Sequence, residues 1–264
     1  MTYWAAVPIM AILCSSCVQQ NHVAKAPPAP TVWERQVRNA ADAGDGDVAL
    51  KALRNRIAAE PNNVAARLDL AAAYRERGYH EVALEVCRLA VERFPQSVEA
   101  QFALVRTLFE MKRPADAVAA LEAHPRQTSE YYSWLGLVLD STGAWPAGES
   151  SHRKAVELAP AQEAPHNNLG YNLLMQKRDA DAAAEFREAL RINPSSALAR
   201  NNLGLALAST DTAQAVSNWQ AASDPATAHN NMATVWIEKG NWEEARKELA
   251  IALGYNRSHP AALL

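Results

Sequence analysis

The chain has 264 residues, with 26 Lys and Arg against 29 Asp and Glu, and a formal net charge of −3 at pH 7. Charges of both signs are interspersed along it, which argues against the basic stripe that holds nucleic acid. Apolar residues make up 49% of the chain but aromatic residues only 7%, so small side chains that suit closely packed helices dominate. We therefore expect an all-α protein without a nucleic-acid partner.

The N-terminus carries the pattern of an export signal. Residues Thr2 to Cys14 form an uncharged apolar run that is too short to span a bilayer. Ser15 and Ser16 follow and then Cys17, so the segment resembles a bacterial lipoprotein signal, in which cleavage precedes a cysteine that receives lipid. We predict lipidation at Cys17. Because no Lys or Arg precedes the run, an ordinary cleaved signal, an uncleaved anchor and a cytosolic N-terminus stay open as alternatives.

The resemblance also implies a location and a division of the chain. Residues 1–17 are the predicted signal segment, and residues 18–30, which include Pro27, Pro28 and Pro30, are a predicted extended linker. Val18 stands where an Asp would imply retention in the inner membrane. The expectation is therefore a lipid-anchored protein at the outer membrane of a bacterial envelope, facing the periplasm.

Residues 31–264 show an internal period. In the stretch Glu163 to Ser196, Leu169 and Leu173 lie on one face of a predicted helix, and Gly170 allows a second helix to approach closely. Shifting this stretch by 34 residues places Gly204 on Gly170. A pair of short amphipathic helices cannot bury both apolar faces alone, so such units are stable only when neighbours stack on them.

This helix–turn–helix period, with Leu-Gly, a turn Gly, Ala, an aromatic, Ala and Pro at fixed places, resembles the tetratricopeptide repeat. The resemblance implies a right-handed α-solenoid of about seven repeats. The predicted repeats are 30–63, 64–97, 98–128, 129–162, 163–196, 197–225 and 226–259, with a partial repeat at 260–264.

Several side chains receive structural interpretations. Asp179 can cap the second helix of the 163–196 repeat with its carboxylate. The preceding repeat carries Gly148 and His152 where the pattern has Ala and an aromatic residue. Cys87 falls on a packing face, where a small buried hydrophobe is expected. Tryptophans at or near the predicted helix–helix packing sites are expected in the core, and they are Trp134, Trp145, Trp219, Trp236 and Trp242.

The first helices of such solenoids line the concave surface, where a peptide from a partner can bind. Asparagines recur there once per repeat, and paired carboxamides can clamp a peptide backbone whatever its sequence. The pattern resembles the asparagine ladder of the O-linked N-acetylglucosamine transferases, although asparagine at this place can also bond only locally. Leu174 and Glu238 lie near the ladder. The predicted groove residues are Asn167, Asn168, Tyr171, Met175, Asn201, Asn202, Leu205, Asn230, Asn231 and Thr234.

No P-loop, G-x-G-x-x-G, G-x-S-x-G or H-E-x-x-H motif occurs, so the sequence predicts no catalytic residue, cofactor, metal or small-molecule substrate. His166 and His229 share a repeat position but lie two repeats apart, too far to ligate one metal. Signal, linker and repeats together resemble the lipoproteins of Tad (Flp) pilus-assembly systems and the pilotins of type IV pilus secretins. That implies a scaffold for a pilus or secretion apparatus. An adaptor that recruits cell-wall hydrolases and a general adaptor of unknown partner are the alternatives.

Overall fold

The computed structural model describes residues 47–123, 126 and 128–256, and these residues form helices and no strands. The Cys17 lipidation site, the linker and the predicted partial repeat at 260–264 lie outside the described residues. The helices are α2 (Val48–Ala59), α3 (Val64–Glu76), α4 (His80–Arg93), α5 (Val98–Glu110), α6 (Pro114–Glu122), α7 (Ser129–Ser141), α8 (Trp145–Leu158), α9 (Glu163–Met175), α10 (Asp179–Ile192), α11 (Ala197–Leu207), α12 (Thr212–Ala222), α13 (Pro225–Glu238) and α14 (Trp242–Tyr255).

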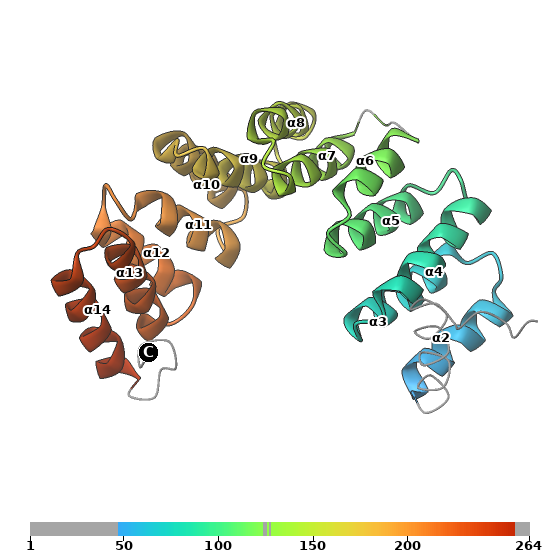
Figure 1. Cartoon of the computed structure of the whole chain (residues 1–264), viewed down its shortest axis with the longest axis horizontal. Coiled ribbons are helices and arrows are strands. Elements are labelled where there is room, and N and C mark those ends of the chain that lie inside the picture. The colour runs from blue at the N-terminus through green and yellow to red at the C-terminus, as the bar shows by residue number, and fades with distance from the viewer. Residues whose placement is uncertain (1–46, 124–125, 127, 257–264) are drawn as a thin grey trace, which may run out of the picture.

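The helices pack in sequence order as antiparallel pairs, and the pairs follow one another around an open arch (Figure 1). In Figure 1, α3 and α7 lie on the inner side of the arch and their partners α4 and α8 on its outer side. We call the first helices of all pairs the inner helices and their partners the outer helices, and the inner helices are α3, α5, α7, α9, α11 and α13. The expected all-α repeat solenoid is thus confirmed.

The local sequence explains where the inner helices begin. Asn63, Ser97, Thr128 and Ser196 each accept, through a side-chain oxygen, a hydrogen bond from the backbone N–H three residues further on. These bonds satisfy N–H groups that have no partner within the helix. The outer helices α4, α8, α10 and α14 begin without a side-chain cap.

Asp179 does not cap α10. It is the first residue of that helix, and Arg178, which occupies the cap position, makes no side-chain capping bond. The interpretation of Asp179 as a cap was therefore wrong. In the turn before α10, Lys177 adopts the left-handed conformation with φ 64°, as Lys112 does before α6 with φ 56°, whereas Gly78 and Gly143 have φ 79° in the corresponding turns before α4 and α8. A side chain at this φ is uncommon.

Within a pair, the helices approach through a glycine and an aromatic side chain. A Cβ built on Gly170 would lie 2.7 Å from the Phe186 ring, and one on Gly204 would lie 2.5 Å from the Trp219 indole. Both rings are fully buried. Each glycine therefore provides the space in which an outer-helix ring packs against the inner helix.

The apolar core is divided along the arch. Buried side chains of α4 to α7 form one cluster, around Phe102, Val105 and Leu121, and those of α9 to α13 form another, around Leu169 and Phe186. The helix between them, α8, buries Gly148, Ser151, His152 and Ala155 and no large apolar side chain. The junction between the two clusters is therefore polar.

The cysteine and the tryptophans separate into different environments. Cys87 is fully buried, as predicted, and burial raises the pKa of its thiol. Trp219 is also fully buried, whereas Trp134, Trp145 and Trp236 are partly buried. Trp242 is 66% exposed on α14, so its placement in the core was wrong.

Candidate functional site: the inner face of the arch

A groove crosses the N-terminal half of the inner face. Its cavity volume is about 320 Å³, and every residue that lines it belongs to α3, α5 or α7. The lining side chains come from corresponding turns of these helices. Asp69, Ala103 and Trp134 are each the sixth residue of their helix, while Ala72 and Arg106 are each the ninth. We call this cavity the inner groove.

The inner groove carries charges of both signs. The Arg75 guanidinium lies 2.7 Å from the Glu110 carboxylate, and the Arg106 guanidinium lies 3.1 Å from the same group. Where α7 lines the groove, partial burial raises the pKa of the Glu130 carboxyl, and the negative charge of Glu99 raises it further. A ligand with a positive charge near Glu130 and Glu99 would relieve their mutual repulsion.

The pKa values of the Glu99 and Glu130 carboxyl groups shift in opposite directions. The pKa of the Glu99 carboxyl is lowered because it accepts hydrogen bonds from its own backbone N–H and from the Ser97 hydroxyl. Glu99 is therefore the fixed charge of this pair. These groove residues were not predicted from the sequence, although aligning the helices by position would have placed Asp69 and Trp134 at the position of Asn168 and Arg106 at that of Tyr171.

The same helix positions continue through the C-terminal half of the inner face. Asn168 is the sixth residue of α9, and Tyr171 and Leu205 are the ninth residues of α9 and α11. Tyr171 and Leu205 are each 41% exposed, although both are large hydrophobic residues. Asn168 and Asn201 are partly exposed, as are Asn230 and Asn231 of α13. This exposed part of the predicted site forms an apolar and carboxamide surface.

Two ladder asparagines are used inside the fold instead. Asn167 and Asn202 are each only 6% exposed, and the Asn202 side-chain amide donates a 3.0 Å hydrogen bond to the Asn167 carbonyl oxygen. This bond joins α9 to α11, so each of the two buried side chains already has a partner within the fold. The expectation that these two asparagines contact a peptide therefore fails.

Four further groove candidates also differ in their surroundings. Leu174 is only 8% exposed and belongs to the core cluster, and Met175 is partly buried against the same cluster. Thr234 is exposed, but its hydroxyl donates to the backbone carbonyl of Asn230 at 3.1 Å. Glu238 is exposed. The available surface is thus narrower than the predicted groove and centres on Asn168, Tyr171 and Leu205.

The two recurring histidines have structural partners. The Nδ1 atom of His166 lies 2.7 Å from the Glu185 carboxylate, and the Nδ1 atom of His229 lies 2.7 Å from the Glu248 carboxylate. In both repeats the pair joins an inner helix to the outer helix that follows it. Within the described residues, no group of three or more His, Cys, Asp or Glu side chains could hold a metal ion.

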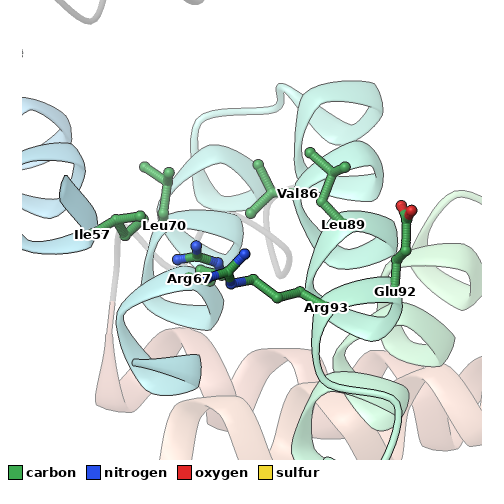
Figure 2. A pocket seen from close by; sticks show the side chains of 7 residues that line it. All are labelled: Ile57, Arg67, Leu70, Val86, Leu89, Glu92 and Arg93. Carbon is green, nitrogen blue, oxygen red and sulfur yellow. The ribbon is translucent and has the colours of Figure 1, made fainter. Parts of the chain in front are cut away.

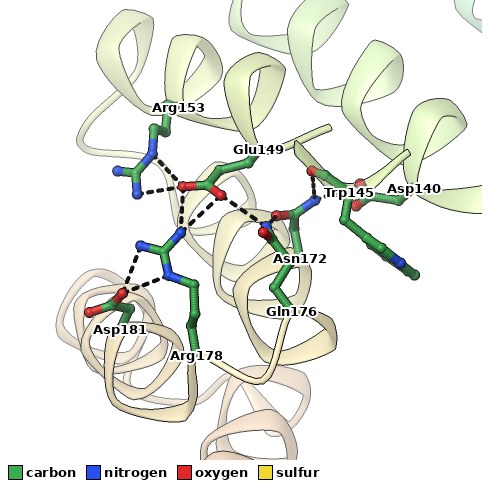
Figure 3. Close-up of polar contacts among 8 residues, drawn as sticks. All are labelled: Asp140, Trp145, Glu149, Arg153, Asn172, Gln176, Arg178 and Asp181. Atoms are coloured by element: carbon green, nitrogen blue, oxygen red, sulfur yellow. Dashed lines mark hydrogen bonds and ion pairs between the residues drawn. The ribbon is translucent and has the colours of Figure 1, made fainter. Parts of the chain in front are cut away.

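A buried polar network occupies the junction between the two core clusters (Figure 3). Asp140 of α7 is 7% exposed, and one of its carboxylate oxygens lies 3.0 Å from Nε2 of the fully buried His152. The other oxygen accepts a 2.6 Å hydrogen bond from the Asn172 amide of α9, which also donates to the backbone carbonyl of Trp145. A Cβ on Gly148 would lie 1.9 Å from Asp140, so glycine there leaves room for the carboxylate.

The network continues to the surface through ion pairs. Gln176 donates to both Asn172 and Glu149, and the Glu149 carboxylate accepts from Arg153 of its own helix and from Arg178 at the start of α10 (Figure 3). These hydrogen bonds lower the pKa of the Glu149 carboxyl against the raising effect of its partial burial. The repeats 129–162 and 163–196 are therefore connected by a polar network that runs from the buried junction to the surface.

The fold defines the chain as an α-solenoid of helical repeats. Comparison with known proteins identifies the type of repeat. Two family models, both described as tetratricopeptide repeat, match the chain, one over residues 35–98, 135–197 and 167–222 and the other over residues 75–134. The chain therefore belongs to the tetratricopeptide repeat family.

Two curated relatives match parts of the repeat region. A TPR repeat-containing protein of Pseudomonas aeruginosa is 33% identical over 112 residues, which are 42% of this chain and 45% of that protein. The protein O-mannosyl-transferase Tmtc2 of Drosophila melanogaster is 34% identical over 83 residues, which are 31% of this chain and 9% of the transferase. The matches thus span less than half of either relative.

Two solved structures share the arrangement of the helices. A chain from the crystal structure of the APC/C hetero-tetramer Cut9–Hcn1 aligns with a TM-score of 0.63 and 16% identity, covering 86% of this chain and 46% of that one. The pilF structure of Pseudomonas aeruginosa aligns with a TM-score of 0.57 and 19% identity, covering 76% and 95%. At these identities the likeness shows the fold.

Proposed function

We propose that this protein is a non-catalytic protein–protein interaction scaffold whose inner face binds an extended or helical segment of a partner protein. The observation that carries the proposal is the exposure of Tyr171 and Leu205 at equivalent positions of neighbouring inner helices, beside the partly exposed amide of Asn168. Aromatic side chains supply much of the affinity at protein interfaces, and carboxamides can bond a peptide backbone in either direction.

Site-specific crosslinking tests where the partner binds. A photoreactive phenylalanine derivative at position 171 or 205 is expected to yield a crosslinked partner in cells, because both side chains point out of the core at the inner face. The same group at position 187, an exposed site on the outer helix α10, is the matched control. The crosslinked partner segment is then synthesised, and its affinity is measured by fluorescence anisotropy.

We expect Tyr171→Ala to weaken binding of that synthetic segment by about tenfold or more, as loss of an interface tyrosine commonly does. Arg187→Ala should leave the affinity unchanged. Crosslinks confined to position 187, or equal affinities for the Tyr171→Ala variant and the unsubstituted protein, would contradict the proposed inner-face site.

We further propose that the scaffold is an envelope lipoprotein that assists assembly of a pilus or secretion apparatus. The support is the apolar N-terminal run that ends at Cys17, followed by a Pro-rich spacer and the repeats. No helix among the described residues is both long and apolar enough to cross a bilayer. Attachment in this proposal depends on the lipid at Cys17.

Replacement of the two N-terminal cysteines tests the anchor. Cys17→Ala is expected to abolish membrane association, whereas Cys14→Ala should retain it, since only Cys17 follows two small residues. The measurement is intact mass combined with membrane fractionation of the natively expressed chain. A full-length, unmodified mass in the soluble fraction would rule out the lipoprotein assignment.

A further inference from the structure

A second cavity lies between α2 and α4, away from the inner groove (Figure 2). Its volume is about 560 Å³, and α3 contributes Arg67 and Leu70 to its lining. None of its lining residues contributes to the inner groove. This cavity, which we call the Arg67 pocket, therefore needs a separate explanation.

The repeat pattern identifies what is unusual about Arg67. It is the fourth residue of α3, as His166 is the fourth residue of α9. His166 pairs with the glutamate nineteen residues later, Glu185. The residue nineteen positions after Arg67 is Val86, which is apolar. The second repeat thus has an arginine at this position without the carboxylate that lies nineteen residues after His166 and His229.

The Arg67 guanidinium is buried in part without a replacement for that carboxylate. Its Nη1 atom is inaccessible to solvent and has no hydrogen-bond partner. Buried polar groups are otherwise almost always paired, and an unpaired end of a charged group is unfavourable. An anion bound at the accessible side of this guanidinium would offset the cost through its opposite charge.

A second arginine reinforces the positive charge. The guanidinium groups of Arg67 and Arg93 lie over the same ring, that of Phe94, at 5.7 Å and 5.8 Å from its centroid. Arg93 is also fixed by a 2.9 Å hydrogen bond from Nη2 to the Asn62 side-chain oxygen. Figure 2 shows the two guanidinium groups side by side, while the carboxylate of Glu92 points away from them.

Apart from Glu92 at its margin, the rest of the Arg67 pocket is aliphatic. Ile57, Leu70 and Val86 line it, and Leu89 is 53% exposed beside them (Figure 2). A ligand that matches this lining combines a carboxylate, which guanidinium groups bind through paired hydrogen bonds, with an aliphatic group that covers Leu89. The exposure of Leu89 indicates an open surface site that suits a peptide better than an enclosed acyl chain.

We propose that the Arg67 pocket binds a peptide segment of a partner protein in which an acidic residue adjoins an aliphatic one. The carboxylate bonds Arg67 and Arg93, and the neighbouring aliphatic side chain packs against Val86 and Leu89. Glu92 at the margin disfavours ligands with many negative charges, such as nucleic acid. The second repeat thereby provides a binding site that is independent of the inner face.

Fluorescence anisotropy with two labelled peptides tests the proposal on the full chain carrying Cys17→Ala. One short peptide alternates leucine and glutamate, and the other has glutamine in place of every glutamate. The acidic peptide should bind about tenfold or more tightly than its neutral counterpart. Arg67→Gln should abolish this difference, while Arg88→Gln, at an exposed position of α4 outside the pocket, should preserve it.

A second variant, at an exposed position, distinguishes a loss of peptide binding from a loss of folding. Leu89→Glu adds a negative charge at the edge of the Arg67 pocket without disturbing the core, and should also reduce affinity for the acidic peptide. Tyr171→Ala should have no effect. Equal affinity for both peptides, retention of binding in both the Arg67 and Leu89 variants, or loss of binding on Tyr171→Ala would each overturn the proposal.

Discussion

Asp140→Ala is expected to lower the free energy of unfolding by about 3 kcal/mol, because it removes the acceptor shared by two buried side chains. His152 already has one unpaired ring nitrogen, Nδ1, and would lose the partner of the other. Asn172 would keep its hydrogen bond to the Trp145 carbonyl but lose the shorter one to Asp140. The space left by the carboxylate would add to the cost.

Urea denaturation followed by far-UV circular dichroism measures this change. Asp181→Ala is the matched control, because the Asp181 side chain is 56% exposed and pairs with Arg178 at the surface. That substitution should cost no more than about 1 kcal/mol. Similar midpoints for the two variants, at equal denaturant dependence, would show that the buried network contributes little to stability.

An apolar replacement of the network gives a sharper result. Asp140→Leu, Gly148→Ala and His152→Phe introduce together the residues that the next repeat has at the same positions. Gly148→Ala alone should be destabilising, because its Cβ would overlap the Asp140 carboxylate. The triple variant should lie within about 1.5 kcal/mol of the unsubstituted protein, since well-packed hydrophobic residues can replace a buried polar pair.

The repeat period predicts most of the fold, because a pair of amphipathic helices with fixed glycine and alanine positions has few ways to stack. It does not predict how neighbouring pairs are oriented. The contact between Asn167 and Asn202 depends on the rotation between α9 and α11, which no single repeat encodes. Position within a helix could therefore place these asparagines near the inner face but could not show that they bond each other.

The polar junction was partly visible in the sequence. Gly148 and His152 depart from the repeat pattern, and both departures belong to the buried network. Their partners Asp140 and Asn172 come from two other helices, and both would be read as exposed polar residues from their type alone. Local patterns show where a repeat is irregular, while the compensating residues are found through long-range contacts.

Trp219→Ala is expected to produce the largest loss of stability, about 4 kcal/mol, because it empties a fully buried aromatic site. The indole fills the space left by Gly204, and its Nε1–H donates a 3.0 Å hydrogen bond to the Asn201 backbone carbonyl. Trp242→Ala is the matched control. Its side chain is 66% exposed, so the change should be about 0.5 kcal/mol.

The effect of Trp219→Ala should also be local. The buried residues of α12 are Ala215 and Trp219, so the tryptophan is the main apolar contact by which this helix holds its neighbours. Because each repeat contacts mainly adjacent repeats, loss of that contact should uncouple α13 and α14 from the rest of the array. Hydrogen exchange should then quicken in α12 to α14 and stay slow in α3 to α5. Uniformly faster exchange along the whole chain would instead indicate that the array unfolds as one cooperative unit.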